Sequence, residues 1–415
     1  MIKYGLLGKA LGHSYSPFIH RQYGDYAYDL YEKNEEELED FLKNGDWDGL
    51  NVTIPYKKAV LPFLDELSEA AKEIGSVNTL VKRADGSIFG DNTDAYGFAE
   101  TLRRSGIALS GKKALVLGNG GACPAVCHAL KQYGAVPVII SRRGEDNYTN
   151  LDRHADAEII VNTTPLGMYP NNGEQALDLA CFKMLSAVYD LIYNPARTAL
   201  LLQAEELGIP AFNGLFMLAA QAAKSSELFT GKAVEEDRIL EVAKLLTASN
   251  VNVVLIGMPG CGKTTIAEKL SEKMHREVLD IDILIAEQTG MTPASWITEK
   301  GEGAFRDIES EAVSEAGKLS GKIIATGGGA VLRPANYPAL HQNGIIIWLQ
   351  RDTSALPVED RPLSQGRNLK ELLAERTPYY ERYADFTVDN DGTVNQAVQE
   401  VLAGLKNMIE EEYQA

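Results

Sequence analysis

The sequence predicts an α/β protein with parallel sheets and two separate nucleotide-binding units. Short apolar, β-branched runs alternate with helical segments along almost the whole chain, which is the pattern of parallel sheets covered by helices. Two glycine-rich loops, within Ala114–Val126 and Val251–Leu270, each follow an apolar run and precede a helical segment. A nucleotide-binding unit therefore begins twice in one chain.

Length and composition fit a globular protein of roughly two to three domains, because the 415 residues are 45% hydrophobic. The net charge of −18 argues against nucleic-acid binding, which needs clustered Lys and Arg. The cysteines lack metal-ligand spacing, the start lacks a signal-peptide core, and the apolar runs are too short to span a bilayer. We expect a cytoplasmic protein with small-molecule substrates, no nucleic-acid partner and no membrane partner, and leave a homo-oligomer open.

The elements follow one another in a regular order up to a boundary that we place near Ser249. We expect helices at residues 35–45, through most of 56–75, after the first glycine loop, and at 215–231 and 235–248. Strands are expected at 2–8, 49–55, 112–118, 135–141, 157–165, 187–193, 209–214, 251–257, 322–329, 344–349 and 385–390, with a hairpin over 77–94 that turns at Asp85-Gly86. The join "LLTASNVN" lacks a long Gly, Pro or Ser tract, so it predicts a short, stiff connection.

The first glycine loop is typical of a dinucleotide site. Gly118, Gly120 and Gly121 follow a strand and open a helix, so backbone N–H groups can approach a pyrophosphate. The second strand ends in Ser141, Arg142 and Arg143, where NAD enzymes usually carry an acidic residue for the ribose. Two guanidinium groups there favour the 2′-phosphate of NADP(H); the alternative is a pair of solvated surface arginines.

Several polar stretches in the first half indicate a substrate site. Ser14 and Ser16 alternate on what we expect to be an extended segment, so both hydroxyls can point at one carboxylate. Lys57 follows a strand end and a proline, where a side chain can face a cleft. Asp94 lies in a turn before a helix, where it could equally cap that helix.

These stretches together resemble shikimate dehydrogenase over roughly residues 1–245. The matching motifs are "HSYSP", "NVTIPYK", "NTD", "NTTPLGM", "YNPARTALL" and "GLFMLAAQAA". The resemblance implies a substrate-binding domain from residues 1–100 and 215–248 and a Rossmann NADP-binding domain from 101–214. It implies NADPH-dependent reduction of 3-dehydroshikimate to shikimate.

By this resemblance Lys57 and Asp94 form the catalytic pair, and an ammonium beside a carboxylate can deliver and retrieve the proton that a ketone reduction needs. The substrate would be held by Ser14, Ser16, Thr53, Asn78, Tyr193 and Gln221. The cofactor site would include Gly118, Gly120, Gly121, Ser141, Arg142, Arg143, Thr163, Gly214 and Met217.

The second loop, "GMPGCGKT", fits the P-loop pattern GxxxxGK[ST] in full. Its glycines, among them Gly260 and Gly262, let the backbone wrap phosphates, and Lys263 can reach the β- and γ-phosphates. The Thr264 hydroxyl suits Mg²⁺, and Thr265 follows it at the start of the helix. We therefore expect ATP and Mg²⁺ to bind here.

Further residues of the second half indicate the acceptor. We expect Asp280 and Asp282 to alternate on a strand end, and Gly327, Gly328 and Gly329 follow a later strand. Together with the spaced arginines Arg306, Arg361 and Arg376, they favour a small polyhydroxylated acid as the substrate.

This set resembles shikimate kinase over roughly residues 251–410, which implies a P-loop α/β kinase domain at 249–415 that phosphorylates shikimate with ATP. By the resemblance, Asp282 binds the accepting hydroxyl, Arg306 and Arg376 bind the carboxylate beside Gly327, Gly328 and Gly329, and Asp280 helps Thr264 to hold Mg²⁺. Lys263 and the lid residue Arg361 would stabilise the transferring phosphate. The stretches around Arg361 are shorter than in the family, and a further nucleotide-contacting arginine before "RPL" has no match.

The two resemblances support each other, because one family makes shikimate and the other consumes it. We therefore predict a bifunctional enzyme that performs consecutive steps, with shikimate diffusing between two pockets. Two alternatives stay open: a quinate or cyclitol dehydrogenase fused to a small-molecule kinase, and a catalytically inactive, ligand-sensing regulator.

Overall fold

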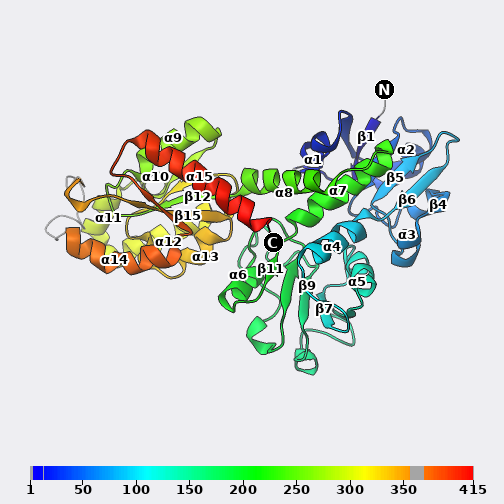
Figure 1. Cartoon of the computed structure of the whole chain (residues 1–415), viewed down its shortest axis with the longest axis horizontal. Helices are drawn as coiled ribbons and strands as arrows, with labels where there is room; N and C mark the ends of the chain where they lie inside the picture. The colour runs from blue at the N-terminus through cyan, green and yellow to red at the C-terminus, as the bar shows by residue number, and fades with distance from the viewer. Residues whose placement is uncertain (1–2, 13, 356–368, 415) are drawn as a thin grey trace.

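The structure is a computed structural model that describes residues 3–12, 14–355 and 369–414. It contains three sheets, each with its own hydrophobic core (Figure 1). The predicted α/β class is confirmed: two of the sheets are entirely parallel, and helices cover them. Within the described part of the chain, no helix combines the length and apolarity needed to cross a membrane.

The first sheet is mixed, with the strand order β2-β1-β3-β5-β6-β4. Strands β1, β2 and β3 are parallel, whereas β5 runs antiparallel to β3 and β6. The predicted hairpin therefore forms, and Gly86 takes the positive φ of 86° that its turn requires. The strands are Lys3–Gly8 (β1), Ala27–Glu32 (β2), Gly49–Val52 (β3), Glu66–Leu67 (β4), Thr79–Lys82 (β5) and Ile88–Asp91 (β6).

Helices from both ends of the first half pack around this sheet. Ile19 of α1 lies in one buried cluster with apolar residues of α7 and α8, so residues after position 214 complete the N-terminal unit. The helices of this region are Ser16–Tyr23 (α1), Leu38–Asn44 (α2), Glu69–Ile74 (α3), Thr93–Arg104 (α4), Leu215–Thr230 (α7) and Glu236–Asn250 (α8).

The prediction of a mostly helical segment at residues 56–75 is wrong for its first half. Turns and a short 3-10 helix at Leu61–Phe63 precede β4, and only α3 is α-helical. Pro62 explains the difference, because it lacks an N–H and disfavours the helical region for the residue before it.

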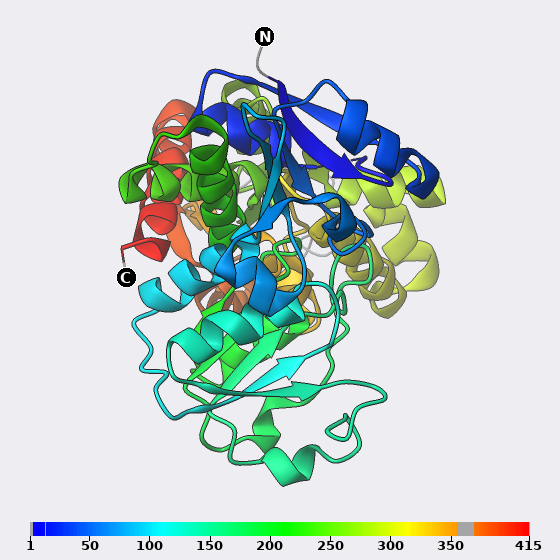
Figure 2. The same ribbon diagram turned by 90° about the vertical axis from the view of Figure 1, so that its right-hand side faces the viewer.

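The second sheet is parallel, with the order β11-β10-β9-β7-β8. The chain adds β8 on one side of β7 and β9 on the other, and such a reversal is where doubly wound folds bind ligands. Its elements are Lys113–Leu117 (β7), Cys123–Gln132 (α5), Val136–Ile140 (β8), Ile159–Asn162 (β9), Ala187–Asp190 (β10), Ala199–Glu206 (α6) and Ala211–Phe212 (β11). Figure 2 shows the first sheet (blue) above the second (cyan to green).

The third sheet is parallel as well, with the order β13-β14-β12-β15-β16. Its strands are Asn252–Ile256 (β12), Val278–Asp280 (β13), Ile323–Ala325 (β14), Gly344–Gln350 (β15) and Phe386–Asp389 (β16). Its helices are Lys263–Met274 (α9), Ile281–Thr289 (α10), Pro293–Lys300 (α11), Glu302–Lys318 (α12), Asn336–His341 (α13), Leu369–Tyr383 (α14) and Val394–Glu412 (α15).

The junction between the halves is short and bonded. Only Val251 separates α8 from β12, and Val251 is buried. Arg276 of the C-terminal unit donates to the carbonyl oxygens of Ala248 and Val251, while Ala196 N donates to Asn343 Oδ1 across the halves at 2.9 Å. Helix α8 thus extends from the first unit into the last one, as Figure 1 shows.

Candidate functional sites

A cleft of about 330 Å³ lies between the first sheet and the second. It brings together all eight residues predicted to bind or transform the substrate: Ser14, Ser16, Thr53, Lys57, Asn78, Asp94, Tyr193 and Gln221. These residues come from segments almost 210 positions apart, counted from Ser14 to Gln221, so the fold assembles the set. Two predicted cofactor residues, Gly214 and Met217, line the same cleft.

Lys57 and Asp94 form an ion pair in this cleft. Lys57 Nζ lies 2.5 Å from Asp94 Oδ2, and the two side chains are only 19% and 13% exposed. Asn78 Nδ2 donates to the other Asp94 oxygen at 2.9 Å. The ammonium is therefore held at a fixed place, with its charge balanced and its remaining N–H bonds free to face a ligand.

A buried polar network fixes Asn78 in turn. Its Oδ1 accepts hydrogen bonds from the Thr93 backbone N–H at 2.7 Å and from the Thr79 hydroxyl at 3.1 Å. Asn51, which is 6% exposed, donates to Thr79 and to Ser225 of α7. Satisfied buried networks are rigid, so this network holds Asn78, and through it the Lys57–Asp94 pair, in a fixed position.

Two local predictions in this cleft are wrong. Ser14 and Ser16 do not alternate on a strand, because α1 begins at Ser16 and the Ser16 N–H donates to Ser14 Oγ at 3.2 Å. Asp94 does not cap α4; it lies in the first turn, and Asn92 occupies the cap position. An acidic side chain in a first turn is favourable there, and this placement leaves both carboxylate oxygens for Lys57 and Asn78.

The cleft also contains residues that the sequence reasoning missed. Asn51 stands in the quoted "NVTIPYK" motif, and its polarity inside an apolar strand was an available signal. Tyr15 lies between the two serines and packs edge-on against Tyr193, with ring centroids 5.7 Å apart. Ala122 adjoins the first glycine loop, so the cleft reaches the predicted dinucleotide site.

The first glycine loop fits a dinucleotide. Gly118 has φ +97°, and an added Cβ would lie 2.8 Å from Thr164 and 3.2 Å from the Thr163 hydroxyl oxygen. At Gly120 and Gly121, in contrast, an added Cβ would meet no atom within 4 Å. This open backbone stands before α5 at the strand reversal, so the space is suited to a pyrophosphate.

The arginines after β8 are exposed and lie next to that loop. Ile140 ends β8 opposite Leu117, the residue before Gly118. Ser141 is buried, whereas Arg142 and Arg143 are exposed, and no ion pair involves either arginine among the described residues. The two guanidinium groups therefore remain available for an anion such as the 2′-phosphate.

The P-loop forms between β12 and α9. Gly257, Gly260 and Gly262 have positive φ values, which allows the backbone to curl around phosphates. Lys263 begins α9 and is only 9% exposed, and its Nζ donates to the carbonyl oxygens of Gly257 and Met258 at 2.9 and 3.0 Å. The lysine thus lies inside the loop, and Thr265 is exposed within the first turn of the helix.

Thr264 and Asp280 meet, as the magnesium prediction requires. Thr264 Oγ1 donates to Asp280 Oδ2 at 2.9 Å. The expected strand position of Asp282 is wrong: Asp280 caps α10 by accepting from the Asp282 and Ile283 N–H groups, and Asp282 belongs to the helix. A hydroxyl and a carboxylate are the hard oxygen donors that Mg²⁺ prefers, alongside water and nucleotide phosphates.

The predicted acid-binding residues also lie together. An added Cβ on Gly329 would clash with the Arg306 guanidinium, and one on Gly327 would lie 3.3 Å from Asp282 Oδ1. The Gly328 carbonyl oxygen accepts from Arg376 at 3.0 Å. Arg306 and Arg376 are only 6% and 3% exposed, so the pocket offers two desolvated cations, which suits a carboxylate.

Glu309 is a further member of this pocket that the sequence reasoning missed. Its side chain is fully buried, and its Oε2 accepts from Arg306 at 2.6 Å. Burial raises the pKa of its carboxyl, and Asp282 adds to this while Arg306 opposes it. The spacing of three residues from Arg306 on a helix was the available signal. Arg361 lies outside the described residues.

Comparison with known proteins agrees with these two sites. The family model for the shikimate dehydrogenase substrate binding domain matches residues 6–80, and the model for shikimate kinase matches residues 259–406. The chain is 35% identical over 266 residues to the shikimate dehydrogenase (NADP(+)) of Clostridium perfringens, which covers 58% of this chain and 98% of that relative.

Solved structures give the same result for the first half. A chorismate mutase/shikimate 5-dehydrogenase fusion protein from Clostridium acetobutylicum aligns with a TM-score of 0.56 and 38% identity, over 59% of this chain and 97% of that one. Shikimate 5-dehydrogenase from Thermus thermophilus, in complex with NADP(H) and shikimate, aligns with a TM-score of 0.53 and 32% identity, over 59% and 99%. The chain therefore belongs to the shikimate dehydrogenase family, and it carries a shikimate kinase domain in the same polypeptide.

Proposed function

We propose that the first half reduces 3-dehydroshikimate to shikimate with NADPH and that the second half phosphorylates shikimate to shikimate 3-phosphate with ATP. The chain is then a bifunctional enzyme of the shikimate pathway. The observation that carries the proposal is the Lys57–Asp94 pair in a cleft that reaches the dinucleotide loop. We assign residues 1–100 and 215–248 to substrate binding, 101–214 to NADP binding and 249–415 to the kinase.

In the first reaction NADPH supplies a hydride to the ketone carbon. Lys57 donates the proton that the ketone oxygen needs, because its ammonium faces the cleft beside Asp94. Asp94 keeps the ammonium in place and stabilises its charge, and Asn78 holds the second carboxylate oxygen. Ser14 and Ser16 hydrogen-bond the substrate carboxylate, while Thr53, Tyr193 and Gln221 hold the ring hydroxyls.

In the second reaction ATP supplies the phosphoryl group, and Thr264 and Asp280 would hold a Mg²⁺ ion that would balance the phosphate charge. Arg306 and Arg376 bind the shikimate carboxylate, so the ring has one orientation. Asp282 then orients the accepting hydroxyl toward the P-loop, where Lys263 stabilises the charge of the transferring group. The proposed role of Arg361 in the lid belongs to residues outside those described.

A one-pot assay tests both activities. Incubation with 3-dehydroshikimate, NADPH and Mg-ATP should yield shikimate 3-phosphate, measured by mass spectrometry. Lys57→Ala should keep NADPH binding but block NADPH oxidation, while it still phosphorylates added shikimate. Lys263→Met should block the second reaction, so that shikimate accumulates. The exposed neighbour Lys58→Ala is the matched control for charge; undiminished reduction by Lys57→Ala would refute the assignment.

A further inference from the structure

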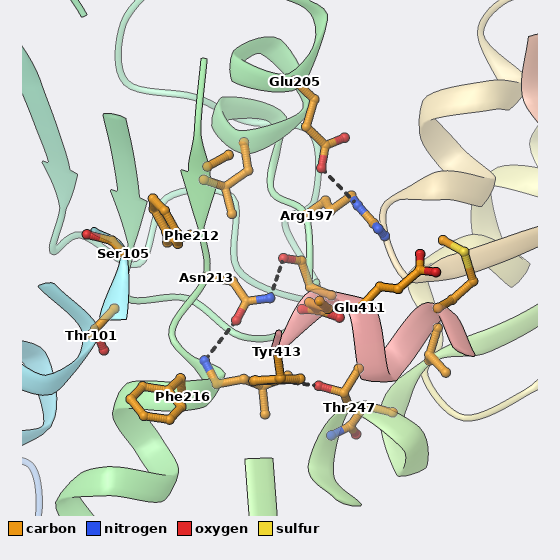
Figure 3. A pocket seen from close by; sticks show the side chains of 18 of the residues that line it. Thr101, Ser105, Arg197, Glu205, Phe212, Asn213, Phe216, Thr247, Glu411 and Tyr413 are labelled. Atoms are coloured by element: carbon orange, nitrogen blue, oxygen red, sulfur yellow. Dashed lines mark hydrogen bonds and ion pairs between the residues drawn. The ribbon is translucent and has the colours of Figure 1, made fainter. Parts of the chain in front are cut away.

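A second cavity, of about 420 Å³, lies between the two halves and is separate from both sites described above. Figure 3 shows its lining: Phe212, Phe216, Glu205 and Arg197 come from the first half, whereas Glu411 and Tyr413 come from the end of α15. The volume falls in the range of small-molecule sites. Neither half alone can form the cavity.

The ionised groups of the lining leave negative charge unpaired. Arg197 Nε donates to Glu205 Oε1 at 3.0 Å, and Arg104 pairs with Glu236 and donates to the Tyr413 carbonyl oxygen. Burial works to raise the pKa of Glu205, but the His341 hydrogen bond and the Arg197 charge outweigh it and lower that pKa. The two arginines are thus already compensated.

Glu411 and Glu412 provide the unpaired charge. Among the described residues, neither carboxylate has a side-chain hydrogen bond or an ion pair within 4 Å, and the nearest compensating charge for Glu412 is that of Arg197. Protein atoms surround Glu412 closely enough to raise the pKa of its carboxyl, although Arg197 opposes the shift. The side chain nevertheless keeps access to solvent, because it borders the cavity.

Backbone dipoles add to this charge. Helices α4, α8 and α15 end at Arg104, Asn250 and Glu412, and all three ends border the cavity. A helix C-terminus carries a partial negative charge that favours cations. Phe212, Phe216 and Leu215 also line the cavity and can pack against a hydrocarbon or aromatic group. The Arg104 guanidinium lies 5.2 Å from the centroid of the Phe216 ring, so the end of α4 adjoins this apolar wall.

We propose that this cavity binds a small organic ammonium ion with an apolar or aromatic body. The ammonium lies against Glu411 and Glu412, and the body lies on Phe212 and Phe216. Among the described residues, no group of three His, Cys, Asp or Glu side chains is placed to hold a metal ion. The same negative charge disfavours the anionic substrates of the two reactions.

Calorimetry on the full chain tests this with phenethylammonium as the probe, and with phenethyl alcohol and phenylacetate as its neutral and anionic analogues. Phenethylammonium should bind once per chain, at least ten-fold more tightly than the alcohol, and phenylacetate should bind more weakly than both. Glu412→Gln should weaken ammonium binding about ten-fold and leave alcohol binding unchanged. Glu400→Gln, on the exposed side of the same helix, should change neither.

Equal affinity for the ammonium and the alcohol in the parent chain would overturn the proposal. Equal ammonium affinity in the parent and in Glu412→Gln would overturn it as well, because binding would then occur elsewhere. Gln keeps the shape of this exposed side chain, so the variant should fold as the parent does.

An independent observation concerns the ATP site and rests on the proposed kinase function. Arg351 directly follows β15, whose carboxyl end lies beside that of β12. An added Cβ on Gly262 would lie 3.9 Å from Arg351 Nη1. Arg351 Nε is buried and has no hydrogen-bond partner. A guanidinium next to a P-loop whose Nε is buried and unsatisfied is suited to a nucleotide.

The geometry points to Arg351 as a nucleotide-contacting residue. Its guanidinium lies at the end of β15. The stretch directly before "RPL" has no match for the family's further nucleotide-contacting arginine, and Arg351 precedes that stretch. Arg351→Met should raise the KM for ATP at least ten-fold and leave the KM for shikimate within two-fold, and Arg351→Lys should recover part of the loss. Arg382→Met, with an arginine elsewhere on the kinase unit, is the control.

If Arg351→Met still phosphorylates shikimate and its KM for ATP is unchanged, the assignment of Arg351 is overturned. Absence of phosphorylation in the parent chain would instead refute the proposed kinase function. The dehydrogenase activity of each Arg351 and Arg382 variant should equal that of the parent chain. This activity serves as the check that the variant is folded.

Discussion

The two reaction sites differ in how their charged side chains are paired. In the first cleft, Lys57 and Asp94 satisfy each other, and Asn78 completes the set. In the kinase pocket, buried atoms of Glu309, Arg376 and Arg351 have no hydrogen-bond partner among the described residues. Buried polar atoms are normally bonded, so the charged groups of the first site are satisfied within the protein, whereas those of the second site keep unused hydrogen-bonding capacity.

The largest effect should come from breaking the pair in the first cleft. Asp94→Asn removes the charge that holds the Lys57 ammonium, so kcat for reduction should fall by about 10³-fold. Phosphorylation of added shikimate should stay unchanged. Glu100→Gln, on the same helix, is the control, and a loss of less than ten-fold in Asp94→Asn would show that Lys57 needs no such partner.

A smaller effect is expected in the kinase pocket, because Arg306 pairs with Glu302 as well as with Glu309. Glu309→Gln keeps a hydrogen-bond acceptor and removes the charge, so the KM for shikimate should rise on the order of 30-fold. The kcat should change less. Steady-state kinetics on the parent and on Glu287→Gln, an exposed change on α10, provide the comparison. A change in kcat alone would contradict a role in binding.

The exposed arginines of the dinucleotide site should have a still smaller effect. Arg142→Ala removes one charged contact to a 2′-phosphate, which at an exposed side chain is worth about 1.5 kcal/mol, the low end for hydrogen bonds to charged groups. The preference for NADPH over NADH should therefore fall by roughly ten-fold or somewhat more. The ratio of kcat/KM for the two cofactors measures it, and kinase activity is the internal control. An unchanged ratio would assign the preference to Arg143 or to another group.

The smallest effect at neutral pH concerns His20, which stacks on Tyr28 with ring centroids 4.0 Å apart. Burial lowers its pKa to about 3, below the value of about 6.5 in an unfolded chain. The contribution of neutral His20 to the free energy of unfolding is therefore complete above pH 6.5. It is lost as the pH falls from 6.5 toward 3, by roughly 1.4 kcal/mol per pH unit.

Replacing that histidine should therefore flatten the acid side of the stability profile. In His20→Phe the free energy of unfolding of the chain should depend less on pH between about 3 and 6.5 than in the parent. Denaturant titrations at several pH values measure the slope, with His128→Gln as the control. An unchanged slope would place the acid sensitivity in other groups.

Much of the arrangement could be predicted from local patterns. Strands β7, β12 and β15 were placed well because they are apolar runs buried in parallel sheets, whereas β2 and β4 were not expected. The eight cleft residues were found through motif resemblance, and no periodicity relates Lys57 to Gln221. Local errors arose where two signals compete: alternating Ser14 and Ser16 also suit a helix start, and Asp280 and Asp282 suit a cap as well as a strand.

Contacts between distant segments could not be predicted. The interdomain cavity is lined by residues from Thr101 to Tyr413, and no sequence pattern links them. Arg351 became visible only through the burial of its Nε and the missing hydrogen bond of that atom, and the helical spacing of Glu309 from Arg306 gained its meaning only from the burial of Glu309. These are properties of packing, which a single sequence does not specify.

The single residue between α8 and β12 has a consequence for cooperativity. Helix α8 belongs to the core of the first unit, and its last turn is bonded to Arg276 of the kinase unit. A long linker would let the two halves melt independently. Here, fraying of α8 removes contacts on both sides, so calorimetry should show overlapping rather than separate unfolding transitions. Expressing either half alone would leave the end of this helix without its partners.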